Sequence, residues 1–327
     1  MRILFITATR IGDAVLSTGL LAHLIERHPD AAITVACGPA AVPLFEGIPQ
    51  VKRRIPMTKR PWGGHWLGLW LACITRRWDL VVDLRGSAMN QAAAGRQHPG
   101  HGRAAQVHGG KNGNHDHRLT TLARIMDLVE PPSPRLWLTD EHAAEAAWLV
   151  PDGGPVLALA PTANWAGKIW PAGNFIAVAE RLTAAGGILP NARIAVFGAV
   201  DERAIAQPVI DAIPKERRID LVGKTHLLTA AAALGRCALF VGNDSSLMHM
   251  AAAMATPTLG LFGPSHDENY GPWGPHCAVA RTATPYAELF SPDYNHRTTG
   301  TLMRSLQVDT VEDAAIALWN RCQGATA

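Results

Sequence analysis

The chain has 327 residues, enough for two domains of ~150 residues each. Hydrophobic residues make up 48% and charged residues 17%, so the sequence can build large buried cores, which excludes a disordered or fibrous protein. The formal net charge of +3 is far below that of a dedicated nucleic-acid-binding protein, whereas an anionic substrate or an anionic membrane surface fits it.

The five cysteines are odd in number, widely spaced and without a Cys-x-x-Cys pair. This excludes a disulfide scaffold and favours reduced thiols. The first ten residues lack a long apolar segment followed by a small-residue cleavage site, and no apolar run is long enough to cross a membrane. We therefore expect a soluble cytoplasmic protein.

The first half of the chain opens with short apolar runs that predict parallel strands covered on both faces. A helix is predicted over residues 13–27, where Leu16, Leu20 and Leu24 form one stripe. The strands are predicted at residues 2–6, 33–36 and 80–83.

Residues 52–78 combine seven basic residues with several tryptophans and leucines. The segment predicts a basic, Trp-bearing helix with its flanks. Such a helix either docks on its own domain or contacts an anionic lipid interface.

Residues 95–118 are rich in glycine and histidine and contain a single acidic residue. The five histidines lack helical ligand spacing, so no metal site is expected. The segment is either a loop that closes on an acidic acceptor or plain disorder.

The second half repeats the alternation of strand and helix, which predicts an α/β fold. The proline- and glycine-rich run at residues 151–155 is the best linker candidate, so we predict domains over residues 1–150 and 151–327. The last helix is expected either within the second domain or packed back on the first. The strands are predicted at residues 156–160, 194–197, 219–222, 239–241 and 258–262, and the helices at 172–185, 201–212, 227–234 and 246–254.

This pattern predicts two doubly wound, Rossmann-like domains that face each other across a cleft. Ligands of such sheets bind at the carboxyl ends of the strands. The turn after the first strand has neither a dinucleotide-binding glycine fingerprint nor a phosphate-binding P-loop. It carries Asp13 instead, which is either a helix cap or a general base that acts on a hydroxyl.

Two turns in the second domain carry candidate ligand groups. After the strand at residues 156–160, Lys168 is placed to neutralise a phosphate and Thr162 to donate a hydrogen bond, unless the lysine is merely solvated. Glu202 follows the next strand, where an acid binds the two hydroxyls of a ribose or simply serves as first-turn helix charge.

The strongest motif is Gly-Asn-Asp-Ser-Ser at residues 242–246, between a strand and a helix of small residues. The free N–H groups of the helix start and the hydroxyls of Ser245 and Ser246 make an anion site, with Asp244 beside them. His249 lies one turn into the helix and faces either the ligand or the sheet.

These blocks together resemble the bacterial heptosyltransferase family, glycosyltransferase family 9, over nearly the whole chain. The resemblance rests on Gly12-Asp13, the loop from Thr162 to Lys168-Ile169-Trp170-Pro171, the turn from Gly198 to Glu202 and the block at residues 244–249, in that order. It implies a GT-B architecture and an inverting, metal-independent transfer of heptose from ADP-heptose to the inner core of lipopolysaccharide.

The resemblance also implies roles for single residues. Asp13 is then the base, Lys168 and Thr162 hold the donor diphosphate, and Glu202 contacts the ribose. Asp244 meets the heptose hydroxyls, Ser245, Ser246 and His249 surround the phosphates, and Thr225 lines the nucleotide pocket.

The implied partners are the nucleotide-sugar donor and an acceptor of the lipid A–Kdo type, whose phosphates Arg53, Lys59 and Arg60 are expected to meet. Neither a cofactor nor a nucleic acid is expected, and a peripheral contact with the inner membrane fits the basic segment. Two alternatives stay open: a GT-B transferase of another nucleotide sugar with a different glycan or protein acceptor, and a non-catalytic nucleotide-binding protein on the same scaffold.

Overall fold

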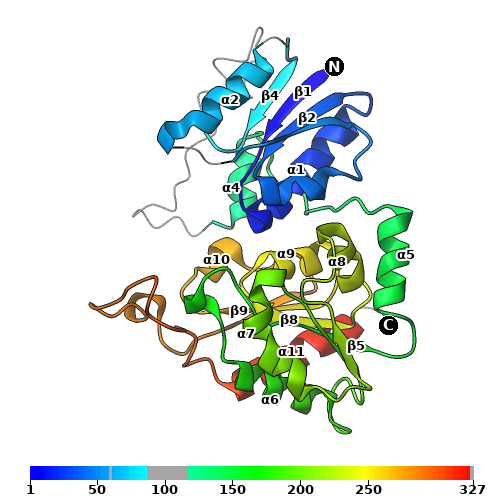
Figure 1. Ribbon diagram of the computed structural model, residues 1–327, viewed down its shortest axis with the longest axis vertical. Helices are drawn as coiled ribbons and strands as arrows, with labels where there is room; N and C mark the ends of the chain where they lie inside the picture. Colours follow the sequence, from blue (N-terminus) through cyan, green and yellow to red (C-terminus); the bar gives the residue numbers. More distant parts are fainter. Residues whose placement is uncertain (59–60, 75, 87–115, 325–327) are drawn as a thin grey trace. The chain divides into compact units, whose positions relative to one another are not determined.

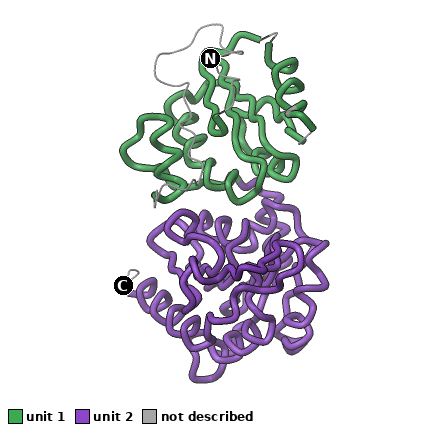
Figure 2. Tube along the Cα trace, turned by 90° about the vertical axis from the view of Figure 1, so that its left-hand side faces the viewer, with its two compact units in different colours: residues 1–137 green, residues 138–327 purple. Residues whose placement is uncertain are grey.

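The computed structural model describes residues 1–58, 61–74, 76–86 and 116–324 (Figure 1). The chain forms two compact units, Met1–Trp137 and Leu138–Ala327 (Figure 2). The division lies before helix α5 (Asp140–Leu149), whereas the sequence analysis placed it at residues 151–155. Helix α5 belongs to the second unit because its Glu145 accepts a hydrogen bond of 2.6 Å from the Thr229 hydroxyl there.

The first unit contains a four-stranded sheet in the order β3-β2-β1-β4, and all neighbouring strands are parallel. Strand β1 lies between β2 and β4, so the chain extends to one side of β1 and then returns to the other. The strands are β1 (Arg2–Ile6), β2 (Ala32–Cys37), β3 (Val51–Pro56) and β4 (Leu80–Asp83).

Strand β3 corrects the prediction for residues 52–78, whose first part is not a flank of the helix but the edge of the sheet. Its burial alternates: Val51 is buried and Arg53 and Ile55 are half-buried, while the residues between them are exposed. This period of two is typical of a half-buried strand. Basic side chains are also common on edge strands, where they prevent pairing with another chain.

Helix α2 covers one face of the first sheet and α1 lies on the opposite face (Figure 1). Leu69 and Cys73 of α2 are buried in one cluster with Leu4 and Ile6 of β1. The helices in the described part of this unit are α1 (Ile11–Arg27), α2 (Gly64–Cys73) and α4 (Arg118–Arg124), with 3₁₀ helices η1 (Pro39–Phe45) and η2 (Pro61–Gly63).

The second unit contains a six-stranded parallel sheet in the order β10-β9-β8-β5-β6-β7. The chain runs from β5 outward through β6 to β7, then returns to the other side of β5 and continues from β8 to β10. This is the strand order of a Rossmann fold. The strands are β5 (Val156–Ala160), β6 (Arg193–Val196), β7 (Arg218–Asp220), β8 (Leu239–Asn243), β9 (Thr258–Phe262) and β10 (Cys277–Arg281).

The last helix, α11 (Val308–Gly324), packs against α6 (Ala172–Thr183) and against β9 and β10 of its own unit. Its buried stripe, Val311, Ala315 and Leu318, follows helical spacing and joins the core of this unit. The other helices are α7 (Arg203–Ala212), α8 (Leu227–Leu234), α9 (Ser246–Ala253) and α10 (Asp267–Tyr270), with 3₁₀ helices η3 (Ala166–Lys168), η4 (Val200–Glu202) and η5 (Tyr286–Glu288).

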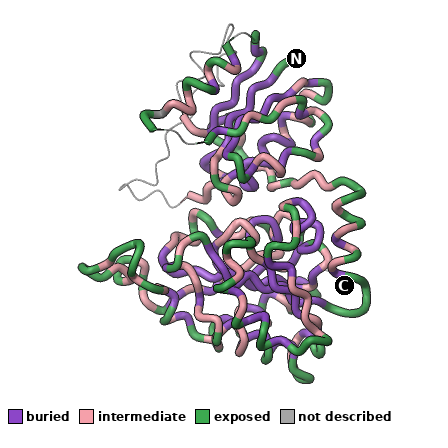
Figure 3. Tube along the Cα trace, viewed as in Figure 1, coloured by how far each residue is buried: buried purple, intermediate pink, exposed green. Residues whose placement is uncertain are grey.

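The strands form the most buried part of each unit (Figure 3). Every residue of β5, β8 and β9 is buried, as expected for strands covered by helices on both faces. Within the described residues, no helix combines the length and the apolar character that a bilayer span requires.

Replacing a glycine by alanine is expected to have opposite effects on stability at two helical positions, Gly19 and Gly68. A Cβ at Gly19 of α1 would lie 2.1 Å from the carbonyl oxygen of Pro132, whereas a Cβ at Gly68 of α2 would meet nothing within 4 Å. We expect Gly19→Ala to destabilise the protein by about 1–3 kcal/mol, because a backbone segment must move. Gly68→Ala should stabilise it by about 0.5–1 kcal/mol. Calorimetric unfolding of both variants tests this, and equal transition temperatures would contradict the close approach at Gly19.

Candidate functional site

The strand order of the second sheet brings motifs that are far apart in the sequence to one edge. Strands β5 and β8 are neighbours in the sheet, although the 78 residues at positions 161–238 separate them in the sequence.

 The direction of the chain's progress across the sheet reverses between these two strands, and a doubly wound sheet binds ligands at such a reversal. Thr162 follows β5 and Asp244 follows β8, so both lie at this position.

An ion pair crosses the reversal point. The Lys168 ammonium group contacts Oδ2 of Asp244. The two side chains are 21% and 8% exposed, so the pair is shielded from bulk water and interacts more strongly than a surface pair. The motifs around Lys168 and Asp244 are therefore parts of one site.

Asn243, which the sequence analysis did not select, anchors the loop that carries Lys168. Its side chain is fully buried, and its Oδ1 accepts a hydrogen bond of 3.1 Å from the backbone N–H of Trp170. The Trp170 indole is also buried and donates a bond of 2.9 Å to the carbonyl of Leu306. The signal in the sequence is an amide at the end of an apolar strand, a position where a buried polar group needs a partner.

Glu202 is held at the end of η4 by two hydrogen bonds to the same oxygen. The Thr162 hydroxyl donates to Oε2 at 2.7 Å, and the backbone N–H of Ala199 donates to it at 2.9 Å. The other oxygen, Oε1, makes no hydrogen bond within the described part of the chain. One face of the carboxylate is therefore fixed, and the other is available to a ligand.

The start of α9 places two serines beside this ion pair. Ser245 is the N-cap residue, but its side chain makes no capping bond. Its Oγ is shielded from solvent and has no hydrogen-bond partner among the described residues. Ser246 is half-buried, and His249, one turn later, is buried. The helix start offers free N–H groups to an anion.

Thr225 lies after β7, at the same edge but two strands away from β5. It is half-buried and immediately precedes the N-cap residue of α8. Thr225 is thus more distant in strand order from the ion pair than Thr162 and Glu202 are.

In the first unit, Asp13 is the third residue of α1 and follows β1. Because β1 lies between β2 and β4, this turn also stands where the chain reverses its direction across the sheet. The Asp13 carboxylate is half-buried and makes no hydrogen bond or ion pair with the described residues. It is therefore not occupied as a side-chain cap of α1 in the described part of the chain.

Asp83, the last residue of β4, and Arg85, two residues later, lie at the same edge as Asp13 and were missed by the sequence analysis. Asp83 is buried and accepts a hydrogen bond of 2.9 Å from the backbone N–H of Arg85. The Arg85 guanidinium lies 4.9 Å from the ring centroid of Trp66. Burial lowers the pKa of Arg85, and the nearby Asp83 charge opposes that shift. The Asp-Leu-Arg-Gly run after an apolar strand was the available signal.

The predicted acceptor residues are only partly described. Arg53 lies in β3 and donates a bond of 3.1 Å to the carbonyl of Ala72 in α2. Lys59 and Arg60 lie outside the described residues, as does the His- and Gly-rich segment up to residue 115.

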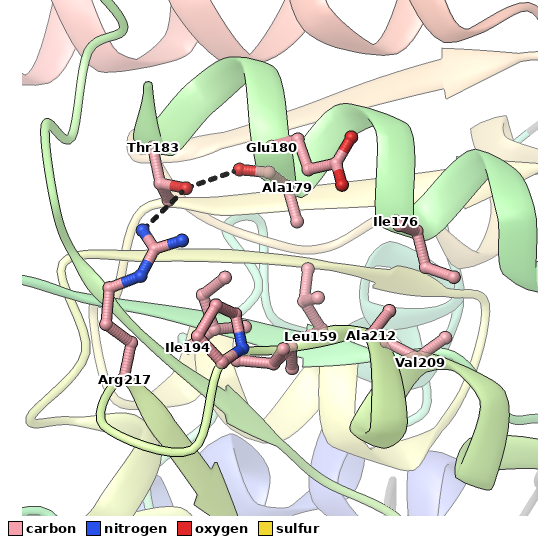
Figure 4. Close-up of a pocket in the computed structure, with 11 residues that line it drawn as sticks. Leu159, Ile176, Ala179, Glu180, Thr183, Ile194, Val209, Ala212 and Arg217 are labelled. Carbon is pink, nitrogen blue, oxygen red and sulfur yellow. Dashed lines mark hydrogen bonds between the residues drawn. The ribbon is translucent and has the colours of Figure 1, made fainter. Parts of the chain in front are cut away.

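A small cavity of about 100 Å³ lies elsewhere in the second unit, between α6 and α7 (Figure 4). Figure 4 shows Thr183 at its rim, where the hydroxyl donates to the carbonyl of Ala179 and accepts a bond from Arg217. None of the candidate site residues lines this cavity. It is therefore separate from the edge that carries Lys168 and Asp244.

Comparison with known proteins identifies the family of this chain. The sequence profile of glycosyltransferase family 9 (heptosyltransferase) matches residues 116–295, more than half of the chain. The chain belongs to glycosyltransferase family 9. A family 9 relative, lipooligosaccharide heptosyltransferase 2 of Haemophilus influenzae, is 25% identical over 86% of this chain and 88% of its own length.

Solved family 9 structures share the fold of this glycosyltransferase. A glycosyl transferase family 9 protein from Veillonella parvula gives a TM-score of 0.76 at 20% identity and covers 98% of this chain and 97% of its own. The E. coli ADP-heptose lps heptosyltransferase II gives 0.73 at 22% identity and covers 99% and 100%. Each unit of this family 9 chain is thus a Rossmann-like half of a GT-B fold.

Asp220 is the last residue of β7, the outermost strand of the second sheet, and it lies at the same edge as Lys168 and Asp244. Its carboxylate connects β7 to the start of α7 and to the turn after β7. Arg203 donates two hydrogen bonds of 2.8 Å to its carboxylate, and Lys224 donates a third of 2.8 Å. Burial raises the pKa of Asp220, but these hydrogen bonds outweigh it, and the net pKa is below its ordinary value.

A group with a lowered pKa stabilises the folded state above its unfolded pKa of ~4, and this contribution is lost as the pH falls through the folded pKa. We expect Asp220→Asn to lower the melting temperature by about 2–4 °C at pH 7 and by progressively less below pH ~4. Thermal unfolding at several pH values tests this. The exposed Asp313→Asn is the matched control, and an equal effect of both variants would refute the role of the network.

Proposed function

We propose that this family 9 protein is an inverting glycosyltransferase that transfers a heptose from ADP-heptose to the inner core of lipopolysaccharide. Family membership and the heptosyltransferase activity named for its relatives support this proposal. The observation that carries it is the Lys168–Asp244 pair at the reversal point of the second sheet, beside the free start of α9.

We assign the donor to the second unit. Lys168, Ser245 and Ser246 bind the diphosphate, since a cation, hydroxyls and helix N–H groups all favour an anion there. His249 supports that helix start. When the diphosphate binds, it competes with Asp244 for the lysine, and this frees the Asp244 carboxylate for the heptose hydroxyls.

We assign the nucleoside end of the donor to the neighbouring strands. The unpartnered Oε1 of Glu202 accepts from the ribose hydroxyls. Thr162 contributes by holding the other oxygen of that carboxylate, because its own proton is already donated there. Thr225 lines the outer part of the nucleotide pocket.

The acceptor is assigned to the first unit. Asp13 accepts the proton of the acceptor hydroxyl while the hydroxyl oxygen forms a bond to the anomeric carbon of the heptose. The bond from that carbon to the diphosphate breaks, and the electron pair leaves with ADP. Lys168 and the α9 N–H groups stabilise the negative charge that develops on the leaving group.

Arg53, Lys59 and Arg60 are proposed to bind phosphates of a lipid A–Kdo type acceptor through charge-assisted hydrogen bonds. Such an acceptor is anchored in lipid. The reaction is therefore proposed to take place at the cytoplasmic face of the inner membrane.

A thermal-shift panel of ADP-sugars and UDP-sugars, followed by product analysis, tests the donor assignment. We expect ADP-heptose to raise the melting temperature most. Lys168→Ala should weaken its binding about 10- to 100-fold, because a charged partner of the diphosphate is lost. The matched control is Lys215→Ala, an exposed lysine that follows α7. A larger shift with a UDP-sugar would show that another nucleotide sugar is the donor.

The base assignment predicts a separate effect on turnover. Asp13→Asn keeps the shape of the side chain but cannot take the proton, so we expect kcat to fall about 10²- to 10⁴-fold while donor binding is retained. Steady-state kinetics and donor titration measure the two quantities. Asp30→Asn, at an exposed position of the same unit, should leave both unchanged. Near-normal turnover of Asp13→Asn would show that another group is the base.

A further inference from the structure

Helix α2 is apolar on both of its sides, although it lies at the surface of the first unit. Its inner side is accounted for: Leu69 and Cys73 are buried, and Trp66 and Trp70 pack against the same core cluster. A helix on a water-facing surface normally carries polar residues on its other side. The outer side of α2 does not.

The outer side presents large hydrophobic residues to solvent. Leu67, Leu71 and Ile74 are 59%, 58% and 44% exposed. They are spaced by four and then three residues, so they lie on one side of the helical turn. Trp62, in the 3₁₀ helix just before α2, is fully exposed. We call these four residues the outer α2 face.

Basic residues accompany this face and acidic residues are missing from its stretch of sequence. Residues 47–78 contain no aspartate or glutamate and seven lysines and arginines. Of these, Arg76 and Arg77 lie three and four residues after the end of α2 and are exposed. The charge of the surroundings thus complements an anionic partner.

Exposed tryptophan and aliphatic side chains next to arginines are typical of a surface that binds lipid. Tryptophan is favoured at the boundary between headgroups and acyl chains, aliphatic side chains enter the acyl region, and arginines bind lipid phosphates. With ten residues, α2 is about 15 Å long, too short to cross a bilayer but suitable for lying in its surface.

We propose that the outer α2 face docks on the surface of an anionic phospholipid bilayer, with Arg76 and Arg77 at the level of the lipid phosphates. This deepens the proposed function, because a lipid-anchored acceptor is presented at such a surface. The docking itself needs neither donor nor acceptor, so it is testable without the reaction.

Sedimentation of the full chain with vesicles tests the proposal. Wild type should bind vesicles that contain phosphatidylglycerol and bind vesicles of phosphatidylcholine alone much more weakly. The variant Trp62→Ser/Leu67→Ser/Leu71→Ser should bind the anionic vesicles at least about tenfold more weakly. Arg76→Gln/Arg77→Gln should lose about fivefold or more, with a weaker dependence on salt.

The matched control is Val129→Ser/Trp148→Ser. These side chains are 97% and 78% exposed but lie outside α2, so their loss should not change vesicle binding. All variants should keep the melting temperature of wild type within a few degrees, because exposed side chains contribute little to stability. Light scattering without vesicles should show the same oligomeric state for wild type and the α2 variant.

Several outcomes would overturn the docking. One is that wild type does not bind anionic vesicles or binds both vesicle types equally. Another is that the control variant loses as much binding as the α2 variant. A third is that wild type self-associates, does not bind vesicles, and is dissociated by the α2 substitutions. The last result would assign the face to a second copy of the chain.

Transfer assays separate this proposal from the proposed function. With an acceptor freed of its acyl chains, the α2 variant should transfer at the wild-type rate, whereas with the acceptor in vesicles it should be slower. Vesicle binding without any transfer would refute the proposed reaction and leave the docking intact. Normal transfer from vesicles by the α2 variant would refute the docking and leave the reaction intact.

Discussion

The ion pair between Lys168 and Asp244 depends on a single topological constraint, the reversal of the chain between β5 and β8. Only because these strands are neighbours does a loop after the first strand of the unit meet a turn that follows its fourth. Asn243 adds a second connection across the same strands through the backbone of Trp170. A shielded cation, a buried carboxylate and a free helix start are thereby held at fixed positions, which suits the binding of an anion.

Asp13 differs from the carboxylates at the edge of the second sheet. In the second unit, the carboxylates of Glu202, Asp220 and Asp244 are all engaged by donors from the protein. In the first unit, Asp13 has no such partner among the described residues, although it lies at the equivalent reversal of its sheet. Engaged carboxylates orient neighbouring groups, while an unengaged one keeps its capacity to accept a proton. The assignment of donor binding to one unit and base chemistry to the other follows this difference.

The first unit also departs from ordinary surface patterning at α2. Its inner residues complete the core under the sheet, so the helix needs no membrane to fold. Its outer residues gain nothing from the fold, because they remain in water. A contact formed after folding is the physical reason that remains for an apolar outer side beside exposed arginines.

The sequence by itself determined which elements form wherever burial is complete. Strands β1, β4, β5 and β9 and helix α8 have the predicted bounds, because continuous apolar runs and helical stripes mark them without reference to neighbours. Strand β3 escaped prediction because its apolar residues alternate with basic ones at a half-exposed edge, and β10, a half-buried strand at an edge of the second sheet, was not predicted either. The motif residues were also visible in the sequence, but only the tertiary structure decided which of them meet. The pairing of Lys168 with Asp244 and of Thr162 with Glu202 depends on the order of strands in the sheet, which local sequence does not encode.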